Sequence, residues 1–176
     1  GLAGQPAFHD RVVAPLRDWR RPLHAGLSSL TAAAEAVAAG DPADALRALD
    51  RALAYLRGTL LPACDAEEFT LFIAVDGVYG ATGAVAVTRP HHRVIAEMTP
   101  DLKRGAGAAR ERNAPPAYAR YLDPLLYGLY GLARGHLESE DAAYLTVLDE
   151  HLSESQVNVI VENLDRIVSA KQAPKR

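Results

Sequence analysis

The chain repeats its apolar residues at steps of three and four positions over long stretches, which is the spacing of one face of an α-helix. The clearest run follows Asp41 and Pro42, a favourable N-cap residue and a proline suited to the first helical position. This run consists of five leucines: Leu46, Leu49, Leu53, Leu56 and Leu60. Strand-like alternation of apolar and polar residues does not accompany it, so the pattern predicts an all-α fold.

Glycine and proline divide the sequence into helical segments. We expect helices over residues 20–39, 42 to about 78, 90–104 and 116–152, with a weaker segment over 8–19 and a loop over 104–116. Pro22 is expected in the opening turn of the first helix, where a proline is tolerated. A last helix follows Ser153 and Gln156, which form a capping box.

Four long helices with short connections predict an antiparallel up-and-down four-helix bundle. We expect a single domain over residues 1–176, with the bundle at residues 19–152 and an extra amphipathic helix at residues 153–170. The extra helix either caps the bundle or serves a dimer interface, so both a monomer and a homodimer stay open.

Charge and composition exclude several classes of protein. The net charge is −3 and the 19 Lys and Arg residues are scattered, which argues against a nucleic-acid partner. No apolar run approaches the roughly 18 residues that span a bilayer. A single cysteine makes no internal disulfide, and no secretory leader pattern opens the chain, so we expect a cytoplasmic protein.

Polar residues interrupt the apolar stripes at two places. Continued beyond Leu60, the leucine run of the second helix reaches Glu67. On the fourth helix, the stripe that contains Leu132 reaches His136 and Glu140. We expect it to return to apolar residues at Ala143 and Val147. Since a buried carboxylate without a partner is costly, and since His136 and Glu140 share one side of a helix, this spacing suits two ligands of one metal ion.

Two further histidines, His24 and His92, each precede an aliphatic residue by three positions on the first and third helices. Each half of the chain thus supplies a helix with one inward histidine and a helix with an inward carboxylate, as in a duplicated helix hairpin around a shared centre. Imidazole and carboxylate groups from four helices suit iron, with manganese less favoured.

These residues resemble the hemerythrin-like, or HHE cation-binding, domains. Those domains are four-helix bundles whose ligands read His, HxxxE, His and then HxxxE or HxxxxD. The matching segments are His24, LPACDAEE at residues 61–68, His92 and HLESED at residues 136–141. The resemblance spans residues 19–151. It implies a non-haem centre of one or two iron ions that meets dioxygen, peroxide or nitric oxide, with five ligands: His24, Glu67, His92, His136 and Glu140.

One position departs from the family pattern, because Ala63 stands where the first HxxxE pair has its histidine. Three outcomes stay open: an open position on the iron beside Glu67, ligation by the neighbouring Cys64, or loss of one iron. Three other residues are second-choice ligands: Glu68, His91 and Asp141.

The missing histidine favours a reactive role over reversible oxygen carriage. We therefore expect an oxidoreductase that handles peroxide or nitric oxide or that oxidises a small organic substrate. The alternative is a degenerate, metal-poor bundle that acts as a partner-binding or regulatory module. Ala63 and the amphipathic last helix motivate this alternative.

Overall fold

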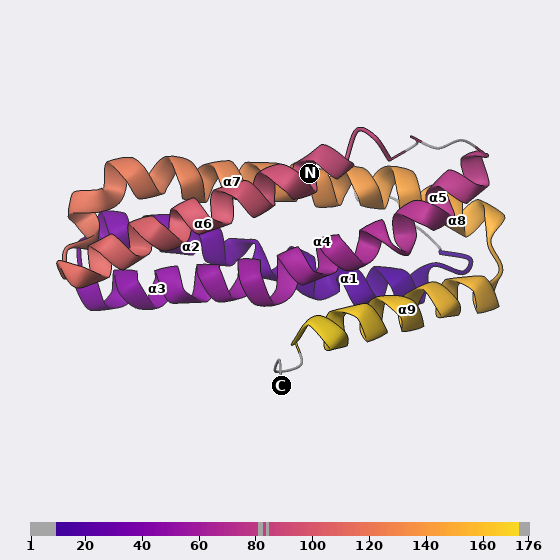
Figure 1. The fold of residues 1–176 in the computed structure, drawn as a ribbon, viewed down its shortest axis with the longest axis horizontal. Coiled ribbons are helices and arrows are strands. Elements are labelled where there is room, and N and C mark those ends of the chain that lie inside the picture. The colour runs from indigo at the N-terminus through magenta and orange to yellow at the C-terminus, as the bar shows by residue number, and fades with distance from the viewer. Residues whose placement is uncertain (1–9, 81–82, 84, 173–176) are drawn as a thin grey trace, which may run out of the picture.

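A computed structural model describes residues 10–80, 83 and 85–172, and these residues form an all-α bundle, which confirms the predicted fold class (Figure 1). The bundle has four rods of consecutive helices, which we call limbs. The first limb contains α1 (Ala14–Gly26) and α2 (Ser28–Ala39). The second limb contains α3 (Pro42–Tyr55), a π-helical turn (Leu56–Leu60), α4 (Leu61–Glu68) and α5 (Leu71–Tyr79). The third limb is α6 (Arg89–Glu111). After a 3₁₀ turn (Pro115–Tyr118), the fourth limb contains α7 (Ala119–Glu140), a second π-helical turn (Asp141–Leu145) and α8 (Thr146–His151). The last helix is α9 (Glu154–Gln172). Among the described residues no helix is long and apolar enough to cross a membrane.

Two predicted helix starts are confirmed by their hydrogen bonds. The Asp41 side chain accepts a hydrogen bond from the Asp44 amide at 2.8 Å and so caps α3. Before α9, the Ser153 amide donates to Gln156 Oε1 at 2.8 Å, and the Gln156 amide donates to Ser153 Oγ at 3.3 Å. This reciprocal pair is the capping box that the sequence predicts.

The start of the first limb differs from the prediction. The helix begins at Ala14 rather than at residue 20, so Pro22 lies inside α1 and not in its opening turn. A break at Leu27 separates α1 from α2, and Phe8, at the start of the expected weaker segment, lies outside the described residues.

The predicted loop over residues 104–116 is too long, because α6 continues to Glu111 and the connection to α7 begins only after it. Gly105 explains the error. A Cβ atom at this position would lie 2.6 Å from the Tyr121 ring, so glycine here permits close packing of α6 against the start of α7 rather than ending the helix.

A layer of buried polar residues divides the apolar core in two. One apolar cluster fills the end of the bundle formed by α2, α3 and the adjoining parts of α6 and α7, and the other fills the end formed by α5, α8 and α9. Arg20 lies between Leu16 of the second cluster and Leu23 of the first. The other three limbs supply their buried polar residues at the same level: Glu67, His92, His136 and Glu140.

The second π-helical turn changes which residues of the fourth limb face the core. A π turn accommodates one extra residue, so the apolar stripe shifts along the sequence. Tyr144 and Leu145 within this turn and Leu148 after it are buried, whereas the expected Ala143 is exposed and Val147 is only partly buried.

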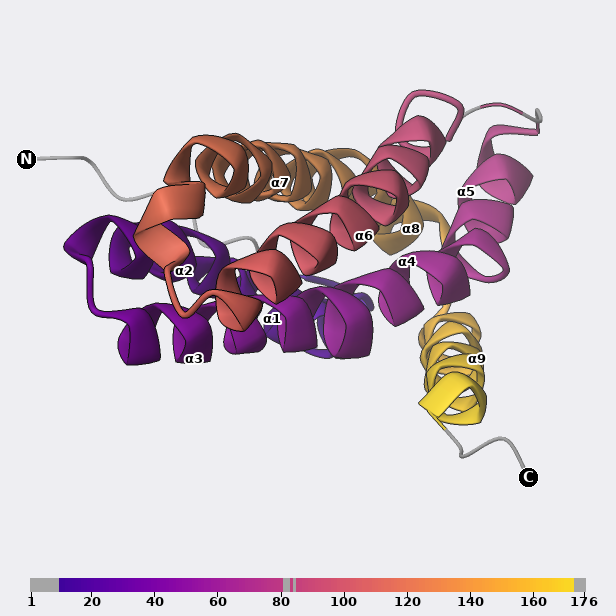
Figure 2. The ribbon, with the colours of Figure 1, turned by 60° about the vertical axis from the view of Figure 1, so that its left-hand side comes forward.

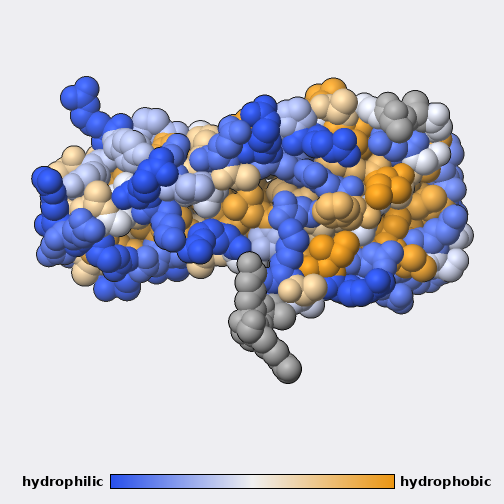
Figure 3. All heavy atoms as spheres, viewed as in Figure 1, coloured by the Kyte–Doolittle hydropathy of each residue, from blue (hydrophilic) through white to orange (hydrophobic). Residues whose placement is uncertain are grey.

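Helix α9 lies outside the four limbs and packs against α1 and α4 (Figure 2). Its buried residues Val157, Ile160 and Leu164 join the second apolar cluster. Hydrophobic side chains also gather on the surface at this end of the molecule (Figure 3). The large exposed hydrophobic residues of the chain include Phe69, which follows α4, Ile73 of α5 and Val159 of α9.

Candidate metal centre

Four side chains from three limbs converge in the polar layer, and we call them the ligand cluster: Glu67, His92, His136 and Glu140. One potential ligand atom from each lies within 4.8 Å of the other three, and all four residues are buried. The Nε2 atoms of His92 and His136 are 2.8 Å apart. Glu140 Oε1 lies 3.2 Å from His136 Nε2, and Glu67 Oε2 lies 3.7 Å from His92 Nε2.

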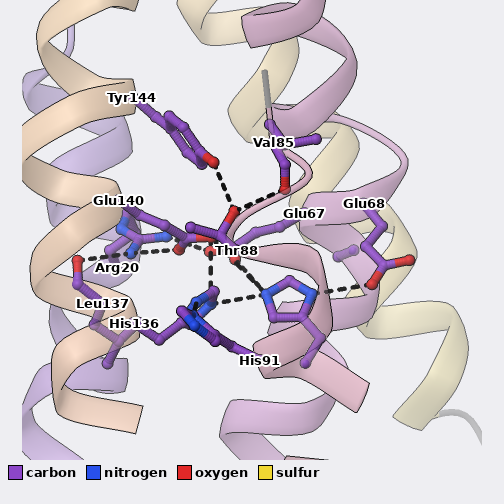
Figure 4. Close-up of polar contacts among 12 residues, drawn as sticks. Arg20, Glu67, Glu68, Val85, Thr88, His91, His136, Leu137, Glu140 and Tyr144 are labelled. Atoms are coloured by element: carbon purple, nitrogen blue, oxygen red, sulfur yellow. Dashed lines mark hydrogen bonds and ion pairs between the residues drawn. The ribbon is translucent and has the colours of Figure 1, made fainter. Parts of the chain in front are cut away.

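Both imidazoles are oriented by a second contact at Nδ1 (Figure 4). The Nδ1–H of His92 donates to Glu68 Oε1 at 3.1 Å, which leaves a lone pair on Nε2. The Nδ1 atoms of His136 and His91 lie 3.3 Å apart. Hydrogen bonds at the remote nitrogen are the usual way in which proteins orient a metal-binding histidine.

The two carboxylates of the cluster each leave one oxygen atom without a hydrogen-bond partner. These atoms are Glu67 Oε2 and Glu140 Oε1, and they are the same oxygens that lie beside the imidazole nitrogens. Buried carboxylate oxygens are normally satisfied. A cation between the four ligand atoms would satisfy both, so the residues present fit a bound metal ion.

Burial shifts the pKa values of all four residues of the ligand cluster toward their neutral forms. Desolvation lowers the pKa of His136 to about 2, with His92, Arg20 and His91 adding to the shift, and it also lowers the pKa of His92. Desolvation raises the pKa of Glu67 against the opposing effect of Arg20, and it raises the pKa of Glu140 further because Glu67 adds to it. The histidines are therefore neutral at pH 7, as metal ligands must be.

The remaining oxygens of both carboxylates contact Arg20, which the sequence reasoning did not include in the site (Figure 4). Arg20 is fully buried on α1, and its Nη1 donates to Glu67 Oε1. Its Nη2 donates to Glu140 Oε2 at 2.9 Å, and its Nε donates to Asp141 Oδ1 at 2.7 Å. Although burial lowers the pKa of Arg20, attraction by these carboxylates outweighs it and holds the guanidinium charged.

His24, predicted as the ligand of the first helix, lies outside the ligand cluster. Its Nε2 is 2.7 Å from Asp141 Oδ2, and about a third of its side chain is exposed, 34%. Asp141 thus lies between His24 and Arg20 and contacts neither imidazole of the cluster in this arrangement.

Of the second-choice residues, Cys64 comes nearest to being an alternative ligand. Its Sγ lies within 4.8 Å of ligand atoms of His92 and His136, so these three residues form an overlapping candidate set. Burial raises the pKa of the Cys64 thiol well above its ordinary value, and Glu67 adds to this effect. Ala63, beside it, is buried and offers no ligand atom.

Aromatic residues close one side of the cluster. The Phe72 ring stacks on the His92 ring, with centroids 5.1 Å apart and an angle of 16° between the planes. Tyr144 meets Phe72 edge-on, and its hydroxyl lies 2.6 Å from Thr88 Oγ1 at the start of α6. The Thr88 hydroxyl in turn donates to the Val85 carbonyl (Figure 4). These contacts hold the residues that precede α6 against the aromatic side of the cluster.

Comparison with known proteins gives one match. The family model of the hemerythrin HHE cation-binding domain matches residues 20–148, which is well over half of the chain. No curated protein and no solved structure matches the chain.

Proposed function

Because the chain belongs to the hemerythrin HHE cation-binding domain family, we propose that it binds non-haem iron through the ligand cluster. One observation carries the proposal: two buried carboxylate oxygens without hydrogen-bond partners lie beside two imidazole nitrogens. Mixed imidazole and carboxylate ligands suit iron and, as our second choice, manganese. Ligation by the Cys64 thiol would favour a softer metal than iron. The two carboxylate oxygens without partners instead favour iron, which is why we propose Glu67 and Glu140 as ligands and not Cys64.

When bound, non-haem iron supplies redox chemistry toward dioxygen, peroxide or nitric oxide, and we propose reactions of this class for the protein. The chain's own residues prepare the site for it. Glu68 and His91 hold the imidazoles in place, and Phe72 shields the His92 ring from water. A cavity of about 550 Å³ borders His92 and is lined by charged side chains of α4 and α6, among them Glu68 and Arg89. We infer that a small molecule would approach the cluster from this cavity, because His92 is the cluster residue that lines it.

Anaerobic titration with Fe(II) tests this proposal. We expect saturable binding, followed by new charge-transfer absorption when dioxygen or peroxide is added. The variant His136→Ala should lose the binding, whereas His151→Ala should keep it, because His151 is an exposed histidine at the end of α8. A wild-type protein that binds no iron, or one that binds it equally well after His136→Ala, would refute the proposal.

The second candidate is a metal-poor bundle that acts as a partner-binding or regulatory module. The observation that favours it is internal compensation: Arg20 neutralises part of the carboxylate charge, and His92 and His136 lie within hydrogen-bond distance of one another. Negligible metal content, together with a partner interaction that survives simultaneous replacement of His136 and Glu140 by apolar residues, would select this candidate.

A further inference from the structure

The guanidinium of Arg20 and the two histidines lie on opposite sides of the same pair of carboxylates. Glu67 gives Oε1 to Arg20 and directs Oε2 toward His92, and Glu140 gives Oε2 to Arg20 and directs Oε1 toward His136. A carboxylate that bridges two cations divides its oxygens in this way. Here one of the two cations is a residue of the chain.

We propose that Arg20 permanently occupies one of two cation positions, so that the centre binds a single metal ion. This inference rests on the proposed function and specifies it further. The metal ion takes the side of His92 and His136, while the guanidinium holds both carboxylates in the orientation that leaves one oxygen of each free for it.

Charge supports a single ion. The buried guanidinium contacts three carboxylates, Glu67, Glu140 and Asp141, so the group carries two net negative charges when all are ionised. One divalent cation neutralises these charges. A second divalent cation would leave an excess of positive charge beside a buried guanidinium, which the low-dielectric interior penalises.

The supply of ligands also supports a single ion. All described residues that form a candidate metal group lie on the histidine side: the ligand cluster and the overlapping set of Cys64, His92 and His136. Ala63 is buried but has no ligand atom, and on the arginine side His24 is held at Asp141, with 34% of its side chain exposed. The Leu137 carbonyl, 3.4 Å from Arg20 Nη2, completes the guanidinium's partners there.

The arginine side would become a metal site if the guanidinium were removed. Arg20→Ser would free three carboxylate oxygens that now converge on one side chain: Glu67 Oε1, Glu140 Oε2 and Asp141 Oδ1. The three oxygens now lie at different guanidinium nitrogens and must move closer together to bind one ion, and carboxylate oxygens are the ligands that hard divalent cations such as Mn(II) prefer. We therefore expect the variant to accept a second ion.

Equilibrium dialysis of the whole chain against Mn(II), with metal analysis and electron paramagnetic resonance, tests the inference. We expect one Mn(II) per wild-type chain, with the hyperfine pattern of an isolated ion, and two per Arg20→Ser chain, with the signature of an exchange-coupled pair. Arg17→Ser is the matched control, because Arg17 lies on the same helix and pairs with Asp10 at the surface, and it should bind one ion.

Each result decides between the two proposals. Two ions in the wild-type protein would overturn the single-ion inference and leave cation binding intact. One ion in a folded Arg20→Ser variant, with folding verified by circular dichroism, would overturn the role assigned to Arg20. No bound ion in the wild-type protein would overturn the proposed function itself. The wild-type resonance spectrum distinguishes one ion from a coupled pair even if the variant does not fold.

Discussion

Replacing Arg20 by methionine in the metal-free protein removes the charge while keeping a side chain of similar length. Arg20 has no exposed surface, and its guanidinium contacts three carboxylates. Removal of one partner from a buried ion pair costs roughly 3–5 kcal/mol, because it leaves an uncompensated charge in the interior. We expect Arg20→Met to lower the free energy of unfolding by about this amount at pH 8.

The cost should shrink at lower pH, because the stranded carboxylates can bind protons. Burial already raises the pKa of Glu67 and Glu140 in the wild-type protein, and loss of the opposing guanidinium raises both further. In the unfolded chain these residues titrate near their ordinary pKa of about 4.3. Above that pH the folded variant holds protons that the unfolded chain has released, so its stability falls as pH rises, by up to about 1.4 kcal/mol per pH unit for each such carboxyl group.

Urea unfolding with a metal chelator present, at pH 5 and pH 8, measures this difference. Trp19 is the only tryptophan, adjoins Arg20 and bonds to Asp165 of α9, so its fluorescence reports on the relevant helices. Arg17→Met is the control and should cost no more than about 1 kcal/mol, because it breaks only a partly exposed pair. An Arg20→Met penalty below about 1 kcal/mol at pH 8, or one that is equal at the two pH values, would refute the reasoning.

Three further predictions concern the metal-binding state. Glu68→Gln removes the charge of the group that accepts the His92 Nδ1–H, so we expect Mn(II) affinity, measured by titration calorimetry, to fall about tenfold. Glu138→Gln is the control, because Glu138 is an exposed carboxylate two residues beyond His136, and it should leave the affinity unchanged. The pKa values of both cluster carboxyls are raised and those of both histidines are lowered, so the protons released on metal binding should come from carboxyl groups, and affinity should increase with pH. Calorimetry in buffers of different ionisation enthalpy counts these protons, and the absence of release would contradict the prediction. Cys64 is buried and its pKa is raised, so iodoacetamide should label it far more slowly in the folded protein than in urea, and equal labelling rates would show that the thiol is accessible. Cys64→Ser should retain Mn(II) binding, and loss of binding would show that the thiol is a ligand.

The sequence alone predicts the all-α bundle and includes all four members of the ligand cluster among its candidate metal ligands. Periodicity does this because a polar residue on an apolar stripe must be buried, and buried polar residues need partners. Glu67, His136 and Glu140 were found by that argument, and the structure brings them together with His92.

Arg20 was missed although the sequence contains the signal for it. Steps of three and four residues backward from Leu30 and Leu27 reach Leu23, then Arg20, then Leu16, so the buried stripe of the first limb passes through Arg20. Arginine is mostly an exposed residue, and a histidine one turn later offered an easier interpretation. The partner carboxylates lie 47 and 120 residues away in sequence, which is why no local pattern shows the pairing.

The second π-helical turn lay beyond what periodicity can predict. The sequence predicts one continuous helix from about residue 116 to residue 152, whereas one extra residue in a wide turn shifts every later position on the buried face. The turn begins directly after Glu140, at Asp141, and both of these residues contact Arg20. Side-chain packing in three dimensions, and not local propensity, determines where such a turn forms.

Anomalous X-ray diffraction at the iron absorption edge, from crystals grown anaerobically with Fe(II), locates any iron bound by the ligand cluster. We expect one iron peak per chain, bounded by the Nε2 atoms of His92 and His136 and by the free oxygens of Glu67 and Glu140, with the Arg20 guanidinium still in place on the other side of the carboxylates. A peak at another position, or no peak in crystals soaked with excess Fe(II), would contradict it.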